Sequence, residues 1–204
     1  MMLEPVVFLV DDDLAVRDSL SLLIKSVGLN VIAYEHPQAF LDDYDASQVG
    51  CLILDIRMPG ISGLTIQDIL KQKGYVIPII FITGHGDIAQ CTRAFKAGAV
   101  DFLTKPVDEQ SLIDSLQMAI KSSIELHRQS KLNADVYEKI SRLSERENQV
   151  LHLLVEGMPN KVIADRLKVS TRTVESHRAK LFEKLEVSSL AECVRIQLSA
   201  AKSI

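Results

Sequence analysis

The chain has 204 residues, of which 47% are hydrophobic and 25% charged, a composition typical of soluble globular proteins and unlike that of disordered ones. No apolar run approaches the roughly 20 residues that a membrane-spanning helix needs, and the first residues, MMLEPVV, lack a secretory signal pattern. Residues 1–120 carry 8 lysines and arginines against 16 aspartates and glutamates, whereas residues 121–204 carry 15 against 11. An acidic half joined to a basic half predicts two domains with different partners, and the basic half favours a polyanion such as nucleic acid.

Residues 1–120 alternate short apolar runs with helical patterns. Each apolar run predicts a strand, and the helical pattern after the first run ends at Gly28. Apolar runs without polar alternation are typical of strands that are buried on both faces of a parallel sheet. We therefore expect a doubly wound α/β domain with five parallel strands and a ligand site at their carboxyl ends. The five runs are residues 6–10, 31–34, 51–54, 78–82 and 100–103.

Carboxylates stand where two of these predicted strands end. Asp11, Asp12 and Asp13 follow the first run, and Asp55 ends the third. Neighbouring carboxylates repel one another unless a cation lies between them, and Mg²⁺ prefers oxygen ligands of this kind. We expect Asp12 and Asp55 to bind the metal directly and Asp11 to act through water.

The same site suits phosphoryl chemistry. A carboxylate such as Asp55 can attack phosphorus to form an aspartyl-phosphate, and the metal would shield it from the negative charge of the incoming group. Thr83 ends the fourth run and Lys105 follows the fifth. We expect Thr83 to donate a hydroxyl hydrogen bond to the phosphoryl group and Lys105 to pair with its charge.

The second half of the chain predicts a linker and a small helical domain. A helix that starts at Asp108 closes the first domain, and we interpret the polar residues 121–139 as a helical or flexible linker without a core of its own. Ser144 and Glu147 then form a capping-box pattern at the start of a new helix. Three more helices are expected over residues 160–167, over residues 171–185 and after Ser189, which makes a four-helix, all-α domain over residues 140–204.

The helices over residues 160–167 and 171–185 indicate a helix-turn-helix, because only a short KVST segment turns the chain between them. One side of the second helix is apolar and would face the core. The opposite side would meet the major groove of DNA as a recognition helix. The apolar side holds Val174, Leu181 and Leu185, and the opposite side holds mostly Arg172, Ser176, Ala179 and Lys180.

The segments LVDDD, LILDIRMPGISGL, ITGHGD and DFLTKP resemble the receiver domain of two-component response regulators over residues 5–120. The resemblance implies a flavodoxin-like fold in which Asp55 is the phosphoacceptor. It implies that Mg²⁺, or Mn²⁺ in its place, is held by Asp11, Asp12, Asp55 and the backbone carbonyl of Arg57.

The resemblance also assigns the residues that respond to phosphorylation. Thr83 and Lys105 would contact the phosphoryl group, and Phe102 would be the rotating aromatic of the switch. Lys105–Pro106 would be a cis peptide. Asp13 falls outside the metal pair, and we expect it to cap the first helix, where the helix dipole favours a carboxylate.

The segment LSERENQVLHLLVEGMPNKVIADRLKVSTRTVESHRAKLFEKLEV resembles the LuxR-type DNA-binding domain over residues 140–200, and the whole chain resembles the subfamily that contains FixJ and NarL. Glu175 departs from members that carry lysine there. A glutamate can accept a hydrogen bond from cytosine but repels phosphates. Arg178 lies at the edge of the apolar face, so a phosphate contact or packing is an alternative for it. The resemblance implies phosphate contacts by Lys161, Thr171, Arg172, Thr173, His177 and Lys180, and possible base contacts by Glu175, Ser176, Arg178 and Ala179.

The implied protein is a phosphorylation-controlled transcription factor. A sensor histidine kinase would phosphorylate Asp55, and the face formed by about residues 88–104 would then change shape and form a homodimer. The dimer would bind double-stranded promoter DNA and act with RNA polymerase, and the family favours activation.

Cys51, Cys91 and Cys193 match neither a disulfide framework nor a zinc site, so we expect reduced thiols in a bacterial cytoplasm, with no membrane partner.

Three alternatives remain. A phosphatase of the haloacid dehalogenase type also forms an aspartyl-phosphate, but it carries a second Asp two positions later, where this chain has Arg57. A dinucleotide-binding enzyme is disfavoured because GHGD lacks the spaced glycines of such a loop. A regulator that acts without phosphorylation is the third, and the complete acidic site argues against it. We therefore expect no enzyme beyond intrinsic, Mg²⁺-dependent self-phosphorylation and dephosphorylation.

Overall fold

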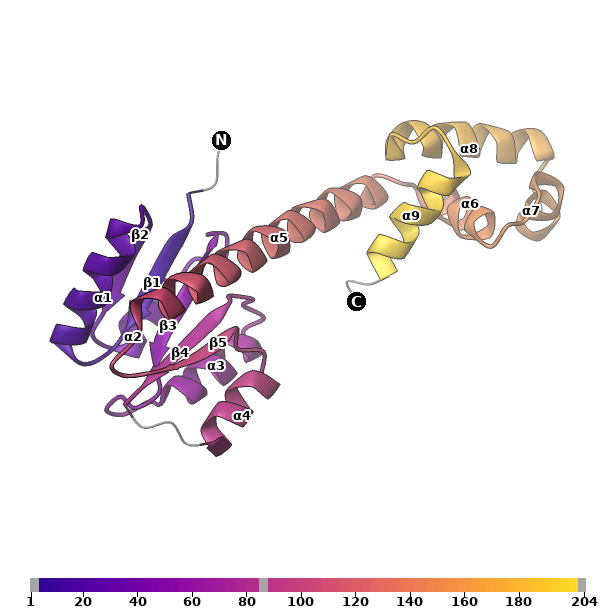
Figure 1. Ribbon diagram of the computed structural model, residues 1–204. Coiled ribbons are helices and arrows are strands. Elements are labelled where there is room, and N and C mark those ends of the chain that lie inside the picture. The colour runs from indigo at the N-terminus through magenta and orange to yellow at the C-terminus, as the bar shows by residue number, and fades with distance from the viewer. Residues whose placement is uncertain (1–3, 85–87, 202–204) are drawn as a thin grey trace. The chain divides into compact units, whose positions relative to one another are not determined.

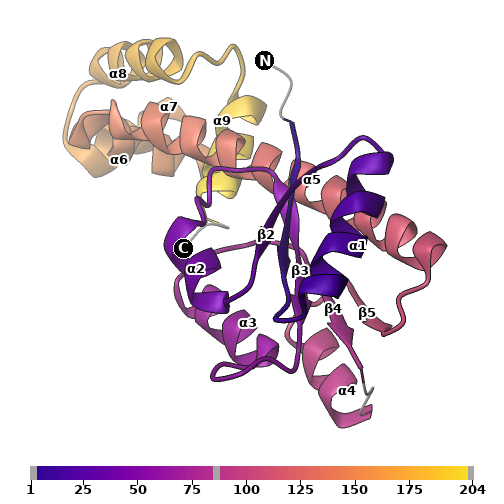
Figure 2. The same ribbon diagram turned by 90° about the vertical axis from the view of Figure 1, so that its left-hand side faces the viewer.

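Five parallel strands form the centre of the first half of the computed structural model, which describes residues 4–84 and 88–201 (Figure 1). These strands are β1 (Val6–Val10), β2 (Asn30–Tyr34), β3 (Gly50–Asp55), β4 (Ile79–Thr83) and β5 (Asp101–Thr104). Their order in the sheet is β2-β1-β3-β4-β5, from one edge to the other (Figure 2). The expected doubly wound domain is thus confirmed. Its strand order reverses between β1 and β3, which is where such sheets place their ligand sites.

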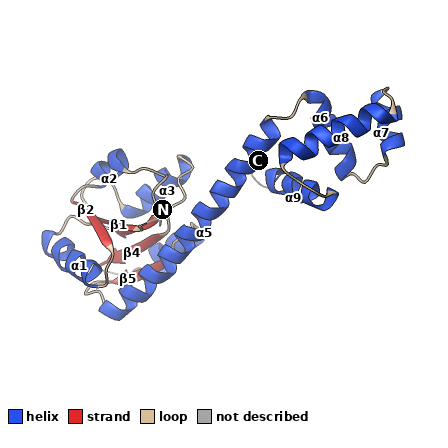
Figure 3. Cartoon of the chain, turned by 90° about the horizontal axis from the view of Figure 1, so that it is seen from above, coloured by secondary structure: helices blue, strands red, loops and turns tan. Residues whose placement is uncertain are grey.

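Helices cover both faces of this sheet (Figure 3). On one face lie α1 (Leu14–Ser26) and the first part of α5 (Glu109–Ser141), which bury Leu20, Ile24, Leu112 and Leu116 against the strands. On the other face lie α2 (Pro37–Asp43), α3 (Gly63–Gln72) and α4 (Ile88–Lys96), which bury Phe40, Leu64, Ile66, Leu70 and Ala94. Burying one such large apolar side chain stabilises a fold by about 1.5–3 kcal/mol, so these two layers hold the sheet rigidly.

The two outer strands are less buried than the sequence pattern predicts. Every residue of β3 and β4 is buried, as expected for central strands. In β2 only Tyr34 is buried, and no residue of β5 is. The expectation of burial on both faces is wrong for these two strands, because each has a neighbouring strand on one side only.

The helix α5 runs without interruption through the segment predicted as a linker. Residues 121–139 are therefore helical and not a flexible connection. The start of this segment still belongs to the first core, because Ser123 is buried and its Oγ accepts a hydrogen bond of 2.9 Å from Gly50 N. The chain divides into two compact units between Arg128 and Gln129.

The second unit is a small helical domain. Its helices after α5 are α6 (Glu145–Val155), α7 (Asn160–Leu167), α8 (Thr171–Leu185) and α9 (Leu190–Ala201), which match the expected helices closely. Their shared core contains Val150, Leu151, Leu154, Ile163, Ala164, Val174, Leu181, Leu185 and Cys193. Across the described parts of the chain, no helix combines the length and the apolar character needed to span a bilayer.

The three cysteines differ in accessibility. Cys51 in β3 and Cys193 in α9 are fully buried, whereas Cys91 in α4 is partly exposed. Burial raises the pKa of the Cys51 thiol to about 12 and also raises that of Cys193. All three thiols are free, as the sequence spacing predicts.

Candidate functional site

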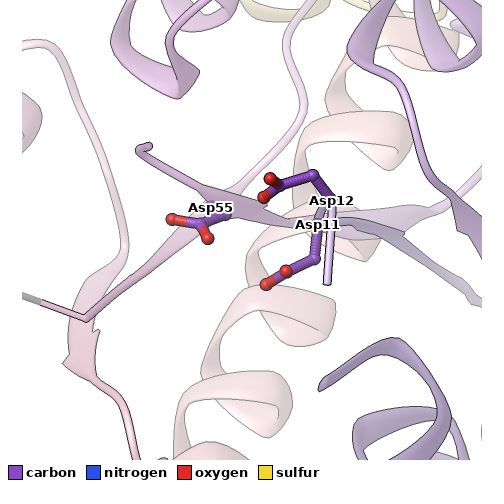
Figure 4. A group of neighbouring side chains, drawn as sticks. All are labelled: Asp11, Asp12 and Asp55. Carbon is purple, nitrogen blue, oxygen red and sulfur yellow. The ribbon is translucent and has the colours of Figure 1, made fainter. Parts of the chain in front are cut away.

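Three carboxylates gather where β1 and β3 end (Figure 4). Asp11 and Asp12 directly follow β1, and Asp55 is the last residue of β3. One oxygen from each carboxylate lies within 4.8 Å of the other two. Asp11 and Asp55 are 0% and 4% exposed, whereas Asp12 faces solvent. The parallel pairing of β1 with β3 thus brings the predicted acidic residues together at one edge of the sheet.

Lys105 lies between the two buried carboxylates. Its Nζ is 2.6 Å from Asp11 Oδ2 and 2.6 Å from Asp55 Oδ2. Burial raises the pKa of Asp11, although the contact with Lys105 opposes this effect. Burial also works to lower the pKa of Lys105, but the contacts with Asp11 and Asp55 outweigh it, so that this pKa is raised. The ammonium therefore stays charged and compensates the carboxylates.

The donor set suits a hard divalent cation. All three side chains offer oxygen atoms, which Mg²⁺ and Mn²⁺ prefer. Asp11 Oδ2 is buried and, within the described part of the chain, receives no hydrogen bond of good geometry, although Lys105 Nζ is close to it. This carboxylate oxygen therefore keeps acceptor capacity for a metal ion. The residues present therefore fit the metal that the sequence predicts.

Backbone groups hold Asp55 and its loop in place. Arg57 N donates a hydrogen bond of 2.9 Å to Asp55 Oδ1, while the Arg57 side chain points to solvent. Gly63, the first residue of α3, donates from its N to Ile56 O at 3.1 Å. A Cβ at Gly63 would lie only 2.3 Å from Asp55 O, so the close approach of α3 to this loop requires glycine.

The remaining predicted residues of the first unit lie at the same edge or beside it. Thr83 ends β4 and is buried, and its carbonyl accepts a hydrogen bond of 2.7 Å from Lys105 N. The Lys105–Pro106 peptide is cis, as expected. Phe102 in β5 is partly buried and packs against the core on the α2–α4 face. Asp13 caps α1 by accepting hydrogen bonds from the first turn, which confirms its predicted role.

Two contacts near the carboxylates were missed by the sequence analysis. One is the close packing of Gly63 described above. The other is Arg17 in α1, whose Nη1 donates a hydrogen bond of 2.7 Å to the backbone carbonyl of Asp11. The only sequence signal for it is an arginine placed in the helix that follows the acidic residues.

In the second unit, α8 presents the predicted polar face. Val174, Leu181 and Leu185 are buried in the core, as expected. Arg178 is partly buried, and its guanidinium lies 5.2 Å from the centre of the Phe182 ring, a stacking arrangement that favours packing for this residue. Of the other candidates, Lys161, Thr171, Arg172, Glu175, Ser176, Ala179 and Lys180 are exposed, and Thr173 and His177 are partly buried.

Local contacts fix the start of α8 and its attachment to α6. Lys168 ends α7 in the left-handed conformation, and Ser170 caps α8 by accepting from Thr173 N. The capping box of α6 forms as predicted between Ser144 and Glu147. Lys184 Nζ lies 2.7 Å from Glu147 Oε2, and this contact, together with the cap, lowers the pKa of the buried Glu147 to about 2. The contact holds α8 to the N-terminus of α6.

Comparison with known families gives two matches that follow the same division. Residues 7–117 match the model described as "Response regulator receiver domain". Residues 141–197 match the model described as "Bacterial regulatory proteins, luxR family". The acidic site lies inside the first match, and the helices α7 and α8 lie inside the second.

Known proteins resemble the chain over nearly its whole length. It is 44% identical to the response regulator protein TodT of Pseudomonas putida, over 94% of this chain and 84% of that protein. It is 43% identical to the transcriptional regulatory protein FixJ of Azorhizobium caulinodans, over 95% of this chain and 92% of that protein. Among solved structures, the response regulator StyR matches with a TM-score of 0.86 and 41% identity, over 95% of this chain and 98% of that one.

Proposed function

Because the chain belongs to the two-component response regulators that join a receiver domain to a luxR-family DNA-binding domain, we propose that Asp55 is the residue whose phosphorylation controls its DNA binding. The phosphoryl donor is a sensor histidine kinase. We assign residues 1–120 to the receiver domain, residues 121–139 to the helical linker and residues 140–204 to the DNA-binding domain. The observation that carries this proposal is the buried Asp55 carboxylate, held beside Asp11 and Lys105 at the reversal point of the sheet.

Asp11, Asp12, Asp55 and the backbone carbonyl of Arg57 would hold Mg²⁺, or Mn²⁺ in its place. When bound, the metal supplies positive charge that offsets the repulsion between the carboxylates and the incoming phosphoryl group. One carboxylate oxygen of Asp55 attacks phosphorus, and the bond from phosphorus to the donor atom breaks. Lys105 pairs with the transferred group, and the Thr83 hydroxyl donates a hydrogen bond to it.

Phosphorylation adds roughly 1.5 to 2 negative charges at Asp55, by analogy with other phosphorylated residues. Thr83 moves toward this charge, and Phe102 turns inward into the space that Thr83 leaves. The face formed by about residues 88–104 changes shape and forms a homodimer. The modification shifts a population of conformations that already exist, because it interacts differently with each of them.

The dimer places two copies of α8 in successive major grooves of promoter DNA, which raises affinity through effective concentration. Phosphate contacts come from Lys161, Thr171, Arg172, Thr173, His177 and Lys180, and their exposed or partly buried positions on α7 and α8 support this. Base contacts come from Glu175, Ser176 and Ala179, whereas the stacking of Arg178 on Phe182 supports a packing role for Arg178 in place of the base contact that the resemblance implies. The bound dimer recruits RNA polymerase and activates transcription in the bacterial cytoplasm. No enzymatic turnover is proposed beyond Mg²⁺-dependent self-phosphorylation and dephosphorylation at Asp55.

The test is DNA affinity with and without phosphorylation. Operator sequences are first selected from a random DNA pool with the full chain treated with acetyl phosphate and Mg²⁺. Affinity for the selected DNA is then measured for the wild type and Asp55→Asn, each with and without acetyl phosphate. We expect tighter binding only for the treated wild type. Equal affinity in all four samples would show that phosphorylation of Asp55 does not control DNA binding.

A further inference from the structure

Arg17 connects three elements behind the carboxylates. Its Nη1 donates a hydrogen bond of 2.7 Å to the backbone carbonyl of Asp11, and its Nη2 lies 3.8 Å from Glu35 Oε2, just beyond the end of β2. The side chain belongs to the first turns of α1 and is only 12% exposed. A mostly buried guanidinium that donates to a backbone carbonyl restrains the position of that carbonyl.

The carbonyl that Arg17 holds belongs to the peptide between Asp11 and Asp12. The Asp12 carboxylate is exposed, and no hydrogen bond from any residue that the structure describes fixes it. Its position therefore depends on its backbone, which Arg17 restrains on one side and the cap at Asp13 on the other. Removing Arg17 would release the peptide while leaving all three carboxylates in the chain.

The lost charge and the lost hydrogen bond of an Arg17 variant would change its affinity for the metal in opposite directions. A positive charge close to the site repels a divalent cation, so its removal alone would strengthen metal binding. The loss of the hydrogen bond to Asp11 O would weaken metal binding, because the Asp12 carboxylate would no longer be held in place. The sign of the change therefore separates the two effects.

We propose that Arg17 is a positioning residue for the cation held by Asp11, Asp12 and Asp55, acting through the Asp11 carbonyl. This inference rests on the proposed function of the acidic site. Residues that orient metal ligands without touching the metal typically contribute 10- to 100-fold to its affinity. Since only the Asp12 carboxylate, one of four proposed ligands, depends on Arg17 for its position, we expect a loss near the lower end, about 10-fold.

The experiment measures the dissociation constant of Mg²⁺ by calorimetry on the full chain. The variants are Arg17→Met, which keeps the length of the side chain but removes its donors, and Lys25→Met. Lys25 is exposed in the last turn of the same helix, so its substitution removes an equal charge without touching the loop. Melting temperatures without Mg²⁺ are recorded in parallel, because a purely structural role would lower these and leave the dissociation constant unchanged.

We expect Arg17→Met to bind Mg²⁺ about 10-fold more weakly than both the wild type and Lys25→Met. If Arg17→Met fails to fold, Arg17→Lys provides the comparison, because its single Nζ cannot serve both Asp11 O and Glu35; weaker binding is again expected. Unchanged or tighter Mg²⁺ binding by the folded Arg17 variant would overturn the inference while leaving the proposed function intact. A wild-type chain that binds no Mg²⁺ would instead overturn the proposed function, and this inference with it.

Discussion

Lys105 Nζ lies 2.6 Å from Asp55 Oδ2, although Asp55 ends β3 and Lys105 follows β5, two strands that β4 separates in the sheet. The same ammonium is 2.6 Å from Asp11 Oδ2, so one cation compensates two buried carboxylates. A divalent metal between the carboxylates would compensate the same charge. Lys105 and the metal therefore compensate the same negative charge of Asp11 and Asp55, so the effect of each on stability depends on the presence of the other.

Lys105→Met should destabilise the chain in the absence of metal. The substitution leaves Asp11 and Asp55 buried without their cation, and we expect a loss of about 1–3 kcal/mol in the free energy of unfolding at pH 7. Added Mg²⁺ should stabilise this variant more than the wild type. The measurement is urea unfolding with and without Mg²⁺, with Lys25→Met as the control for lost charge. An equal Mg²⁺ effect in the wild type and the Lys105 variant would contradict the prediction.

Gly63→Ala should disturb the loop that carries Asp55. The added Cβ would lie 2.3 Å from Asp55 O, so the backbone must shift, at a cost of about 1–3 kcal/mol in stability. Mg²⁺ affinity should fall as well, because the shift moves Asp55. Gly84→Ala is the matched control, since its Cβ would meet no atom of the described residues within 4 Å and its φ is not in the left-handed region. Thermal melting and calorimetry compare the two variants. Similar melting temperatures and similar dissociation constants for Mg²⁺ would refute the prediction.

Glu147 should contribute stability that depends on pH. The ion pair with Lys184 lowers its folded pKa to about 2, below the ordinary value of about 4.3 in an unfolded chain. The contribution is therefore complete above the unfolded pKa and is lost as the pH falls from about 5 toward 2. Glu147→Gln should cost about 1–3 kcal/mol at pH 7 and much less near pH 2. Urea unfolding across this pH range tests it, with Glu145→Gln, an exposed change in the same turn, as the control for lost charge.

Lys180→Ala should weaken DNA binding without changing sequence preference. Lys180 is exposed on α8, and a lysine that contacts phosphate contributes to affinity on every sequence. The slope of log affinity against log salt should become less steep by about 1. Lys131→Ala, an exposed change in α5, is the control for lost charge. An unchanged salt slope for Lys180→Ala would show that this residue does not contact DNA.

Local signals predicted much of this structure. The helix over residues 160–167 and the helix over residues 171–185 have the predicted bounds, because their apolar spacing and the short turn between them are local features of the sequence. The capping box at Ser144 and the cap at Asp13 were confirmed for the same reason. The gathering of Asp11, Asp12 and Asp55 followed from the parallel strands alone, since parallel strands end at a common edge.

Contacts between distant side chains were not predictable in this way. The pairing of Lys184 with Glu147 depends on how α8 packs on α6, which no local pattern specifies. Arg17 contacts a backbone carbonyl, and every residue offers such an acceptor, so the sequence does not identify the partner. The exposure of β2 and β5 depends on their places at the edges of the sheet, whereas their apolar composition resembles that of the central strands.

The unequal accessibility of the thiols has a practical consequence. Thiolates are the reactive form of cysteine, and buried thiols with raised pKa values react slowly. A maleimide-linked fluorophore or spin label should therefore attach to Cys91 in α4 while Cys51 and Cys193 stay unmodified. The natural sequence thus carries a single addressable reporter on the helix where phosphorylation is expected to change the surface, and no cysteine has to be added or removed to use it.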